Sequence, residues 1–187
     1  MKHVLVMAVS LLSCALPNGT HAQLRSQKPV YEQETFAVVP GTFKAMFQEA
    51  DAIVDVNIVS SETKGLGANP KVRTFYDASV RRVLKGQIDT THIHFSHAAG
   101  TLELPDKILK ADADPLHVGQ RYILFLYRDK PQLGGWTVLG EIEGAFKVRD
   151  GRVEPEGHGR VAVMQRNLSE RAFDGELRQL NTAREKE

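Results

Sequence analysis

The stretch Ala52-Ile53-Val54-Asp55-Val56-Asn57-Ile58 sets the fold class of this 187-residue chain. From Val54 onward, aliphatic side chains stand at every second position, with Asp55 and Asn57 between them. Successive side chains of a β-strand point to opposite faces. The alternation therefore predicts a half-buried strand with one apolar and one polar face.

Other segments carry strand signals of their own. The run Tyr122-Ile123-Leu124-Phe125-Leu126-Tyr127 is apolar throughout, which is typical of a central strand covered on both faces. The alternation over residues 72–84 slips at Arg81-Arg82-Val83, which predicts a bulge or a bend. Asp150-Gly151 predicts a hairpin turn that leads to Val153. Further strands are expected at residues 91–96, 136–139 and 145–148.

Two segments have helical spacing instead. Residues 43–50 follow a Thr42 cap, and their apolar side chains recur at three- and four-residue spacing. A second helix is expected at about residues 169–183, where Ser169 is a good N-cap and Leu168 can pack onto Phe173. Loops are expected at residues 64–71 and, much longer, at residues 97–119. Long loops without periodicity are usually functional or mobile.

These elements predict a mainly β fold with flanking α-helices. A helix, five or more closely spaced strands and a second helix suggest an OB-like five-stranded β-barrel, because closure removes exposed sheet edges. The predicted domain spans residues 42–155, including its leading helix. Residues 23–41 are expected to be a flexible N-terminal arm, and residues 156–187 a C-terminal segment with the second helix.

Residues 1–22 have the form of a secretory signal peptide. Lys2 precedes a short apolar run, and Ala22 is the small residue before the expected cut. The protein is therefore expected in the periplasm or outside the cell. Leu11-Leu12-Ser13-Cys14 offers an alternative cut, after which Cys14 would carry a lipid anchor. No apolar run reaches the roughly 20 residues of a transmembrane helix, so no transmembrane segment is expected.

Charge and cysteine content narrow the function classes. The chain has 24 Lys and Arg residues against 23 Asp and Glu, and loss of the leader removes Lys2, which leaves no net charge. A neutral chain has no general attraction to nucleic acid, so no nucleic-acid partner is expected. Cys14 is the single cysteine and leaves with the leader, so no disulfide is expected.

Three short motifs carry a resemblance to a known group. In order they are Glu49-Ala50-Asp51-Ala52-Ile53-Val54, then Val83-Leu84-Lys85-Gly86 after Val80, then Val118-Gly119-Gln120-Arg121-Tyr122 with the apolar run that follows. Together they resemble a group of exported bacterial proteins of unknown function. The barrel of that group is similar to the OB-type fold of the tissue inhibitors of metalloproteinases and the netrin-like modules.

That resemblance implies an architecture over roughly residues 43–153 and says little about activity. The metalloproteinase inhibitors chelate the zinc of their target with a free N-terminal cysteine, held in place by disulfides. Here the predicted mature N-terminus is Gln23 and no cysteine remains. Inhibition by that chemistry is therefore not expected.

The sharpest candidate for chemistry is the segment His92-Ile93-His94-Phe95-Ser96-His97. On a strand, His92 and His94 share a face and could present two imidazoles to one ion, with His97 as a third ligand just past the strand end. Neutral imidazole suits zinc, copper or nickel, so a zinc or copper site is the one cofactor that the sequence leaves open. The alternative is that these histidines are polar residues of a solvent-facing strand.

Two pairs of carboxylates support a weaker, hydrolytic alternative. Asp112 and Asp114 lie in the long loop, and Glu141 and Glu143 lie between strands. Such pairs act as acid and base only at a defined separation. The chain has no Gly-x-Ser-x-Gly elbow and no phosphate-binding loop. The leading expectation is therefore not an enzyme. It is an exported binding module for a protein, peptide or glycan, contacted mainly through residues 97–119, with periplasmic transition-metal binding as the alternative.

Overall fold

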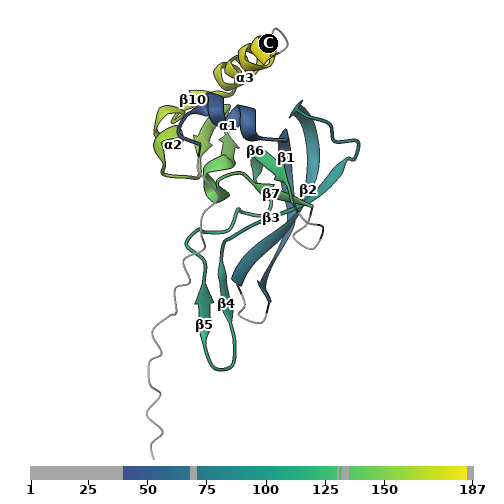
Figure 1. Cartoon of the computed structure of the whole chain (residues 1–187), viewed down its shortest axis with the longest axis vertical. Helices are drawn as coiled ribbons and strands as arrows, with labels where there is room; N and C mark the ends of the chain where they lie inside the picture. Colours follow the sequence, from purple (N-terminus) through teal and green to yellow (C-terminus); the bar gives the residue numbers. More distant parts are fainter. Residues whose placement is uncertain (1–39, 68–70, 130, 132–134, 185–187) are drawn as a thin grey trace, which may run out of the picture.

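The structure is a computed structural model that describes residues 40–67, 71–129, 131 and 135–184 (Figure 1). The predicted signal peptide, and the predicted flexible N-terminal segment up to residue 39, lie outside the described residues. In chain order the elements are α1 (Phe43–Glu49), β1 (Ala52–Leu66), β2 (Lys71–Lys85), β3 (His92–His97), β4 (Thr101–Glu103), β5 (Ile108–Lys110), β6 (Arg121–Arg128), β7 (Trp136–Val138), the 3-10 helix η2 (Glu141–Gly144), β8 (Ala145–Arg149), β9 (Arg152–Pro155), α2 (Arg160–Met164), β10 (Leu168–Ser169) and α3 (Glu170–Arg184).

Five strands form a closed ring of pairings. The order is β1-β2-β3-β7-β6, and β6 pairs back onto β1 from Ala52↔Leu126 to Asn57↔Arg121. All of these pairings are antiparallel except β3–β7, which is a single parallel bridge between Ser96 and Thr137. Strands β8, β9 and β10 extend the sheet from β6. The predicted mainly β fold with flanking helices is confirmed, and its five-strand closure takes the form of this ring.

The ring encloses one apolar core and carries a second on its outside. The inner core is made of alternate residues of the five strands, closed at one end by Leu116. The outer core lies between the ring, strands β8 and β9, and the three α-helices. Strands β1 and β6 contribute to both cores, which is why Phe125 faces outward and is nonetheless fully buried. The predicted central strand over residues 122–127 is confirmed.

Helix α1 and the end of β2 are built around each other. Thr42 caps the helix as predicted, accepting from the backbone N–H of Ala45 at 3.1 Å. At the other end the buried Lys85 ammonium donates to the carbonyls of Phe47, Gln48 and Ala50, which would otherwise lack partners. This arrangement accounts physically for the Lys85 position of the second motif.

Gly86 follows Lys85 at a point where no side chain fits. Its φ is +79°, and a Cβ there would lie 2.3 Å from the carbonyl oxygen of Asp51. The Asp51 carboxylate in turn accepts from the backbone N–H of Arg128 at 2.8 Å. The first two motifs therefore meet at one end of the ring and fix the entry of β1.

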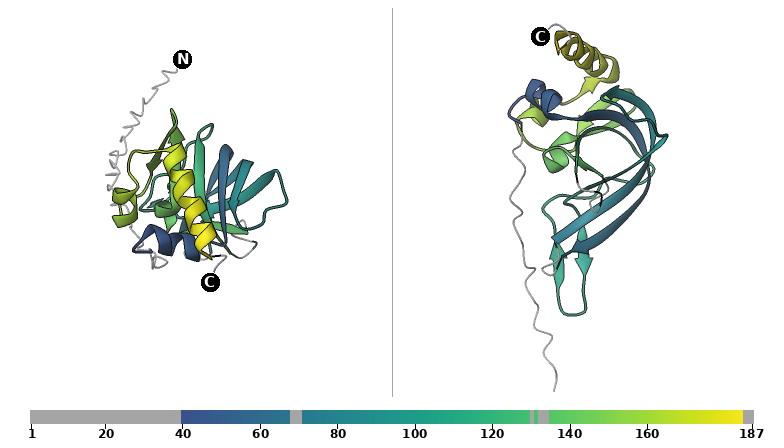
Figure 2. Two further views of the ribbon diagram at one scale, coloured as in Figure 1. Left: turned by 90° about the horizontal axis from the view of Figure 1, so that it is seen from above. Right: turned by 45° about the vertical axis from the view of Figure 1, so that its right-hand side comes forward.

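Helix α3 docks on the outside of the ring beside α1, as seen from above in Figure 2. Phe173 packs edge-on against Phe43, with ring centroids 5.3 Å apart. Ser169 caps the helix as predicted, accepting from the N–H of Ala172 at 3.1 Å. Leu168 packs against the same core.

An ion-pair network holds the first turn of α3 to the ring. Asp55 is fully buried and accepts from Arg82 at 2.9 Å and from Arg121 at 2.7 and 2.8 Å. The two guanidiniums also bind Glu170 and Asp174 of α3. Burial alone would raise the pKa of Asp55, but the two arginines outweigh it and hold that pKa below its ordinary value. At Asp55 the polar face predicted for β1 is thus an internal ion-pair centre, whereas Asn57 on the same face is half-buried.

The register irregularities of β1 and β2 confirm the predicted bulge. Asp55 pairs with Arg82 and Val56 pairs with Val80, so Arg81 is the extra residue. The Asp150–Gly151 hairpin turn is also confirmed, with φ of 51° and 72°.

Three local features differ from what the sequence indicates. The loop expected at residues 64–71 is shorter than predicted, because β1 continues to Leu66 and β2 begins at Lys71. The loop expected at residues 97–119 contains the β4–β5 hairpin. The sequence also gave no signal for α2, which has no side-chain cap. In all three places tertiary contacts stabilise structure that local periodicity does not reveal.

Candidate functional site

The outer face of β3 carries the two histidines that the sequence singled out. His92 and His94 are both exposed, and Ile93 and Phe95 between and beyond them are buried in the ring. The predicted alternation is therefore correct for this strand. The pair lies on the strand next to β2, since His92 pairs with Ser79 and His94 with Asp77.

Asp77 gives this face a second polar layer. Its Oδ1 lies against Nδ1 of His94. Its Oδ2 accepts a hydrogen bond from the Ser60 hydroxyl at 3.0 Å. The carboxylate stands between the hydroxyl and the imidazole, so His94 cannot act as a base toward Ser60 here. The arrangement instead orients the His94 ring and leaves its Nε2 on the solvent side.

His97 has a different environment from the other two. It belongs to β3, where it pairs with Thr74, and its side chain is fully buried and stacked on Tyr76 with centroids 5.4 Å apart. Neither of its ring nitrogens has a hydrogen-bond partner of standard geometry among the described residues. Burial lowers the pKa of His97 to about 4, helped by the charge of Arg73 and opposed by the backbone of Asp114.

The three histidines therefore do not come together. His97 was expected just past the strand end, where its side chain could reach the outer face. Because the strand continues through His97, its side chain points inward with Phe95. Within the part of the chain that the structure describes, no three His, Cys, Asp or Glu side chains are grouped to hold a metal ion.

Each of the two glutamates of η2 accepts hydrogen bonds from backbone N–H groups. Glu141 accepts from the N–H of Ala98 at 2.7 Å and lies 3.9 Å from a guanidinium nitrogen of Arg73. Its φ of 57° is unusual for a residue with a Cβ, and the bond to Ala98 explains why that conformation is kept.

Glu143 occupies a cradle formed by two glycines. Its Oε1 accepts from the backbone N–H groups of His158 and Gly159 at 2.9 and 2.8 Å. A Cβ at Gly157 or Gly159 would lie 2.5 to 2.7 Å from the carboxylate. The two glutamates thus bind different segments, and their contacts do not make the acid–base pair of a hydrolase. Asp112 and Asp114 are both exposed.

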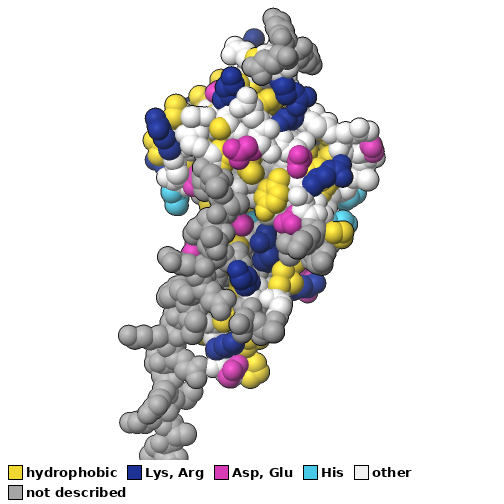
Figure 3. Space-filling view, viewed as in Figure 1, with side chains coloured by type: hydrophobic (Ala, Val, Ile, Leu, Met, Phe, Trp, Pro, Cys, Tyr) yellow, Lys and Arg dark blue, Asp and Glu magenta, His cyan; other side chains and the backbone are white. Residues whose placement is uncertain are grey.

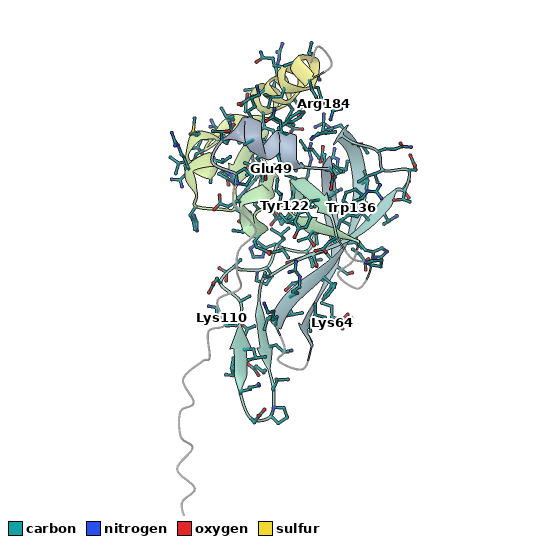
Figure 4. All side chains as sticks on the ribbon, in the orientation of Figure 1. Glu49, Lys64, Lys110, Tyr122, Trp136 and Arg184 are labelled. Atoms are coloured by element: carbon teal, nitrogen blue, oxygen red, sulfur yellow. The ribbon has the colours of Figure 1, made fainter. Side chains whose placement is uncertain are left out.

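The largest feature outside the ring is a projection that we call the arm. It consists of the distal halves of β1 and β2 (residues 59–66 and 71–75) and the β4–β5 hairpin (Figure 1). Residues 59–66 include no buried side chain, and in the β4 and β5 strands only Leu109 is buried. The β2 part of the arm is different, because Val72, Arg73 and Thr74 are buried. Figure 4 shows Lys64 and Lys110 on the two sides of the arm, with Tyr122 in the body above.

Within the arm, the β4–β5 hairpin has a defined attachment to β1 and β2. Thr74 donates its hydroxyl hydrogen to the Ala99 carbonyl at 2.8 Å and lies 2.9 Å from the Thr63 hydroxyl. Gly100 packs on the same two threonines with a φ of +94°, and a Cβ there would be 3.0 Å from the nearest of them. The end of the ring is sealed from this side by Leu116, whose N–H donates to the Tyr76 hydroxyl at 3.0 Å.

The exposed surface is mixed in character. Charges of both signs and single apolar side chains alternate on the face in Figure 3, and histidines reach the surface on both sides of the molecule. Among the described residues no aromatic side chain is exposed, although Phe75, Tyr127 and Trp136 are half-buried. None of the described helices has the length and apolar character needed to cross a membrane.

Sequence reasoning missed Asp77 and Ser60 as partners of the histidine pair. They lie 15 or more residues away and become neighbours of His94 only through the β1–β2–β3 register. Both are polar residues that alternate with apolar ones on predicted strands. The sequence alone does not give the register between those strands, so it could not show that they are neighbours. No protein-family model matches the chain, and no curated protein sequence matches it.

Proposed function

We propose that this protein is an exported, non-enzymatic binding module that contacts a protein or peptide partner through the arm. The observation that carries the proposal is the division of β1. Its first half is buried on both faces, and its second half continues out of the ring with no buried side chain. A two-stranded hairpin is marginally stable in water, so a β1 extension that buries none of its own side chains is best explained by contact with a partner.

The ring supports the proposed barrel class. In the closed ring, β7 lies beside β3 and β6 lies between β7 and β1, so these two strands stand in the reverse of their chain order. This is the arrangement expected of a five-stranded Greek-key barrel. We therefore propose an OB-type barrel similar to that of the metalloproteinase inhibitors and netrin-like modules. The first two motifs that carried this resemblance now have a structural role at Lys85 and Gly86.

Export supports the same function. The proposed leader at residues 1–22 would deliver the chain to the periplasm or beyond the cell, with lipidation at Cys14 as the alternative. Loops and projections on a rigid scaffold are the usual binding elements of small exported domains. The arm is such a projection, and the glutamates once considered as acids are engaged elsewhere.

The chemistry of the arm favours protein over glycan or nucleic acid. Sugar and base recognition rely on exposed aromatic rings, and the described aromatic residues are at least half-buried. The arm instead presents Ile108, which is 49% exposed, among charges of both signs such as Glu103, Asp106 and Lys107. An apolar centre with a charged rim is the usual anatomy of a protein–protein contact.

Site-specific photocrosslinking tests the proposal. A benzophenone amino acid is placed at Ile108 in the arm, and a matched probe at Val163 of α2, which is 60% exposed at the other end of the molecule (Figure 1). Both chains are produced in the exporting cell and irradiated. We expect an adduct of defined mass from Ile108 alone. An excess of unlabelled parent chain should reduce this adduct, and an equal excess of Ile108→Asp chain should reduce it less. Equal adducts from both positions, or none from Ile108, would contradict the arm as the contact surface.

A further inference from the structure

We propose that the outer face of β3 is a binding site for one divalent transition-metal ion, held by Nε2 of His92 and Nε2 of His94 and supported by Asp77. This site is independent of the arm's proposed partner. It uses only two of the three histidines in the His92–His97 segment, because His97 is inside the ring.

Strand geometry sets the separation of the two ligands. Residues two apart on a strand share a face and have Cβ atoms about 7 Å apart. Imidazole rings that lean toward each other over this distance can bring both Nε2 atoms to the ~2.0–2.1 Å of a zinc–nitrogen bond. Both side chains are exposed, so no packing opposes rotation of His92 toward His94, whose ring is already oriented by Asp77.

The second observation is the pairing of His94 with Asp77. Nδ1 of His94 faces the carboxylate in an ion-pair contact, although Oδ1 of Asp77 makes no hydrogen bond of standard geometry. The tautomer with the hydrogen on Nδ1 suits this contact and leaves the lone pair of Nε2 for an ion. A carboxylate behind a histidine is the usual outer partner of a metal ligand, because it fixes the ring and its tautomer. Ser60 holds the other carboxylate oxygen at 3.0 Å, so Asp77 is itself fixed from β1.

His92 has the matching arrangement in weaker form. Its Nδ1 lies 3.2 Å from the Thr91 hydroxyl, and in the tautomer in which Nδ1 donates to that hydroxyl the lone pair of Nε2 is available to an ion. Two neutral imidazoles select zinc, copper or nickel over calcium and magnesium, which prefer oxygen ligands. With two protein nitrogens, the remaining positions of the ion belong to water, so the site is open and not of the closed structural type.

Metal titration of the whole chain, produced without a polyhistidine tag, tests this site. Isothermal titration with Zn²⁺ and electron paramagnetic resonance with Cu²⁺ are expected to report one ion per chain with two nitrogen ligands. His92→Ala and His94→Ala should each weaken binding at least ~10-fold, since each removes half of the chelate. Asp77→Ala should weaken binding ~10-fold or more while one ion per chain still binds.

His158→Ala is the matched control, because His158 is an exposed histidine on the loop before α2. It should leave both titrations unchanged. His92, His94 and His158 are exposed, so the metal-free thermal melts of their variants should match the parent. Asp77 is half-buried, and the melt of Asp77→Ala shows whether that chain is still folded. A double variant His92→Ala, His94→Ala that keeps the parent's affinity and copper spectrum would overturn the site. An Asp77→Ala variant with undiminished affinity would equally overturn the support by Asp77.

Discussion

The ring and the arm share the strands β1 and β2, yet the two halves of β1 are stabilised in opposite ways. In β1, residues 52–58 pack against both apolar cores, and residues 59–66 have no buried side chain. In β2, the ring half holds Ala78 in the inner core, and the arm half buries Val72, Arg73 and Thr74 before it ends at the exposed Lys71. A continuous hairpin can therefore be core at one end and contact surface at the other, and substitutions should separate the two.

The largest effect is expected at Phe125 in the ring. Phe125→Ala removes a ring that is fully buried between Phe43 and Phe146 and should cost about 3–5 kcal/mol of unfolding free energy. Phe75→Ala in the half-buried arm is the matched control and should cost about 1 kcal/mol. Urea denaturation measures both. Equal losses would mean that the arm is part of the core.

His97 should make the ring sensitive to mild acid. Its pKa falls from the ordinary 6.5 to about 4 in the folded chain, mainly by burial, so only the unfolded chain takes up the proton between those values. Stability should therefore fall as the pH drops from about 6.5 to 4, by up to about 3 kcal/mol, and the loss should be complete below pH 4.

His97→Phe keeps an aromatic ring stacked on Tyr76 and removes the titration. Unfolding free energies measured from pH 7 to pH 4 should then lose most of this slope. His94→Ala, on the exposed face of the same strand, should keep it. A His97→Phe chain with the parent's pH profile would show that another group controls the acid response.

Asp55→Ala should cause the next largest loss of unfolding free energy. Asp55→Ala leaves Arg82 and Arg121 without their shared carboxylate, but these side chains are 39% and 19% exposed and can be partly rehydrated. The expected loss is therefore about 2–3 kcal/mol, below that of a fully buried pair. Glu62→Ala breaks the arm's exposed pair with Lys64, 2.7 Å apart, and should change stability by less than about 0.5 kcal/mol. Thermal melts at neutral pH compare the two.

The smallest effect is expected at the tip of the arm. Ile108→Ala removes a side chain that is 49% exposed and should change the unfolding free energy by less than about 0.5 kcal/mol. The same substitution should reduce crosslinking or binding of the arm's partner. A destabilisation above 1 kcal/mol would mean that the hairpin contributes to the core, and the arm could then no longer be separated from the ring.

The fold was predictable where the signal is local. The alternation around Val56, the caps at Thr42 and Ser169 and the slip at Arg81 each depend on a few neighbouring residues, and each has its predicted structure. The β4–β5 hairpin was not predictable in this way. It has one buried residue, Leu109, and its attachment is made by threonines from β1 and β2.

The candidate site was predictable only in part. The shared face of His92 and His94 follows from the period of two, whereas the burial of His97 depended on where the strand ends. Asp77 reaches His94 through the pairing of two strands, so no reading of either strand alone could find it.

The sequence by itself determined the class of the fold, the caps of the flanking helices and the solvent face of β3, because these depend on residues within a turn or a strand of one another. The tertiary structure alone decided that β6 closes on β1, that Asp55 is an internal ion-pair centre, and that β1 leaves the ring after Ile58. Those features join residues tens of positions apart. Local patterns carry no register information over such distances, and the pairing is fixed only when both apolar cores are packed.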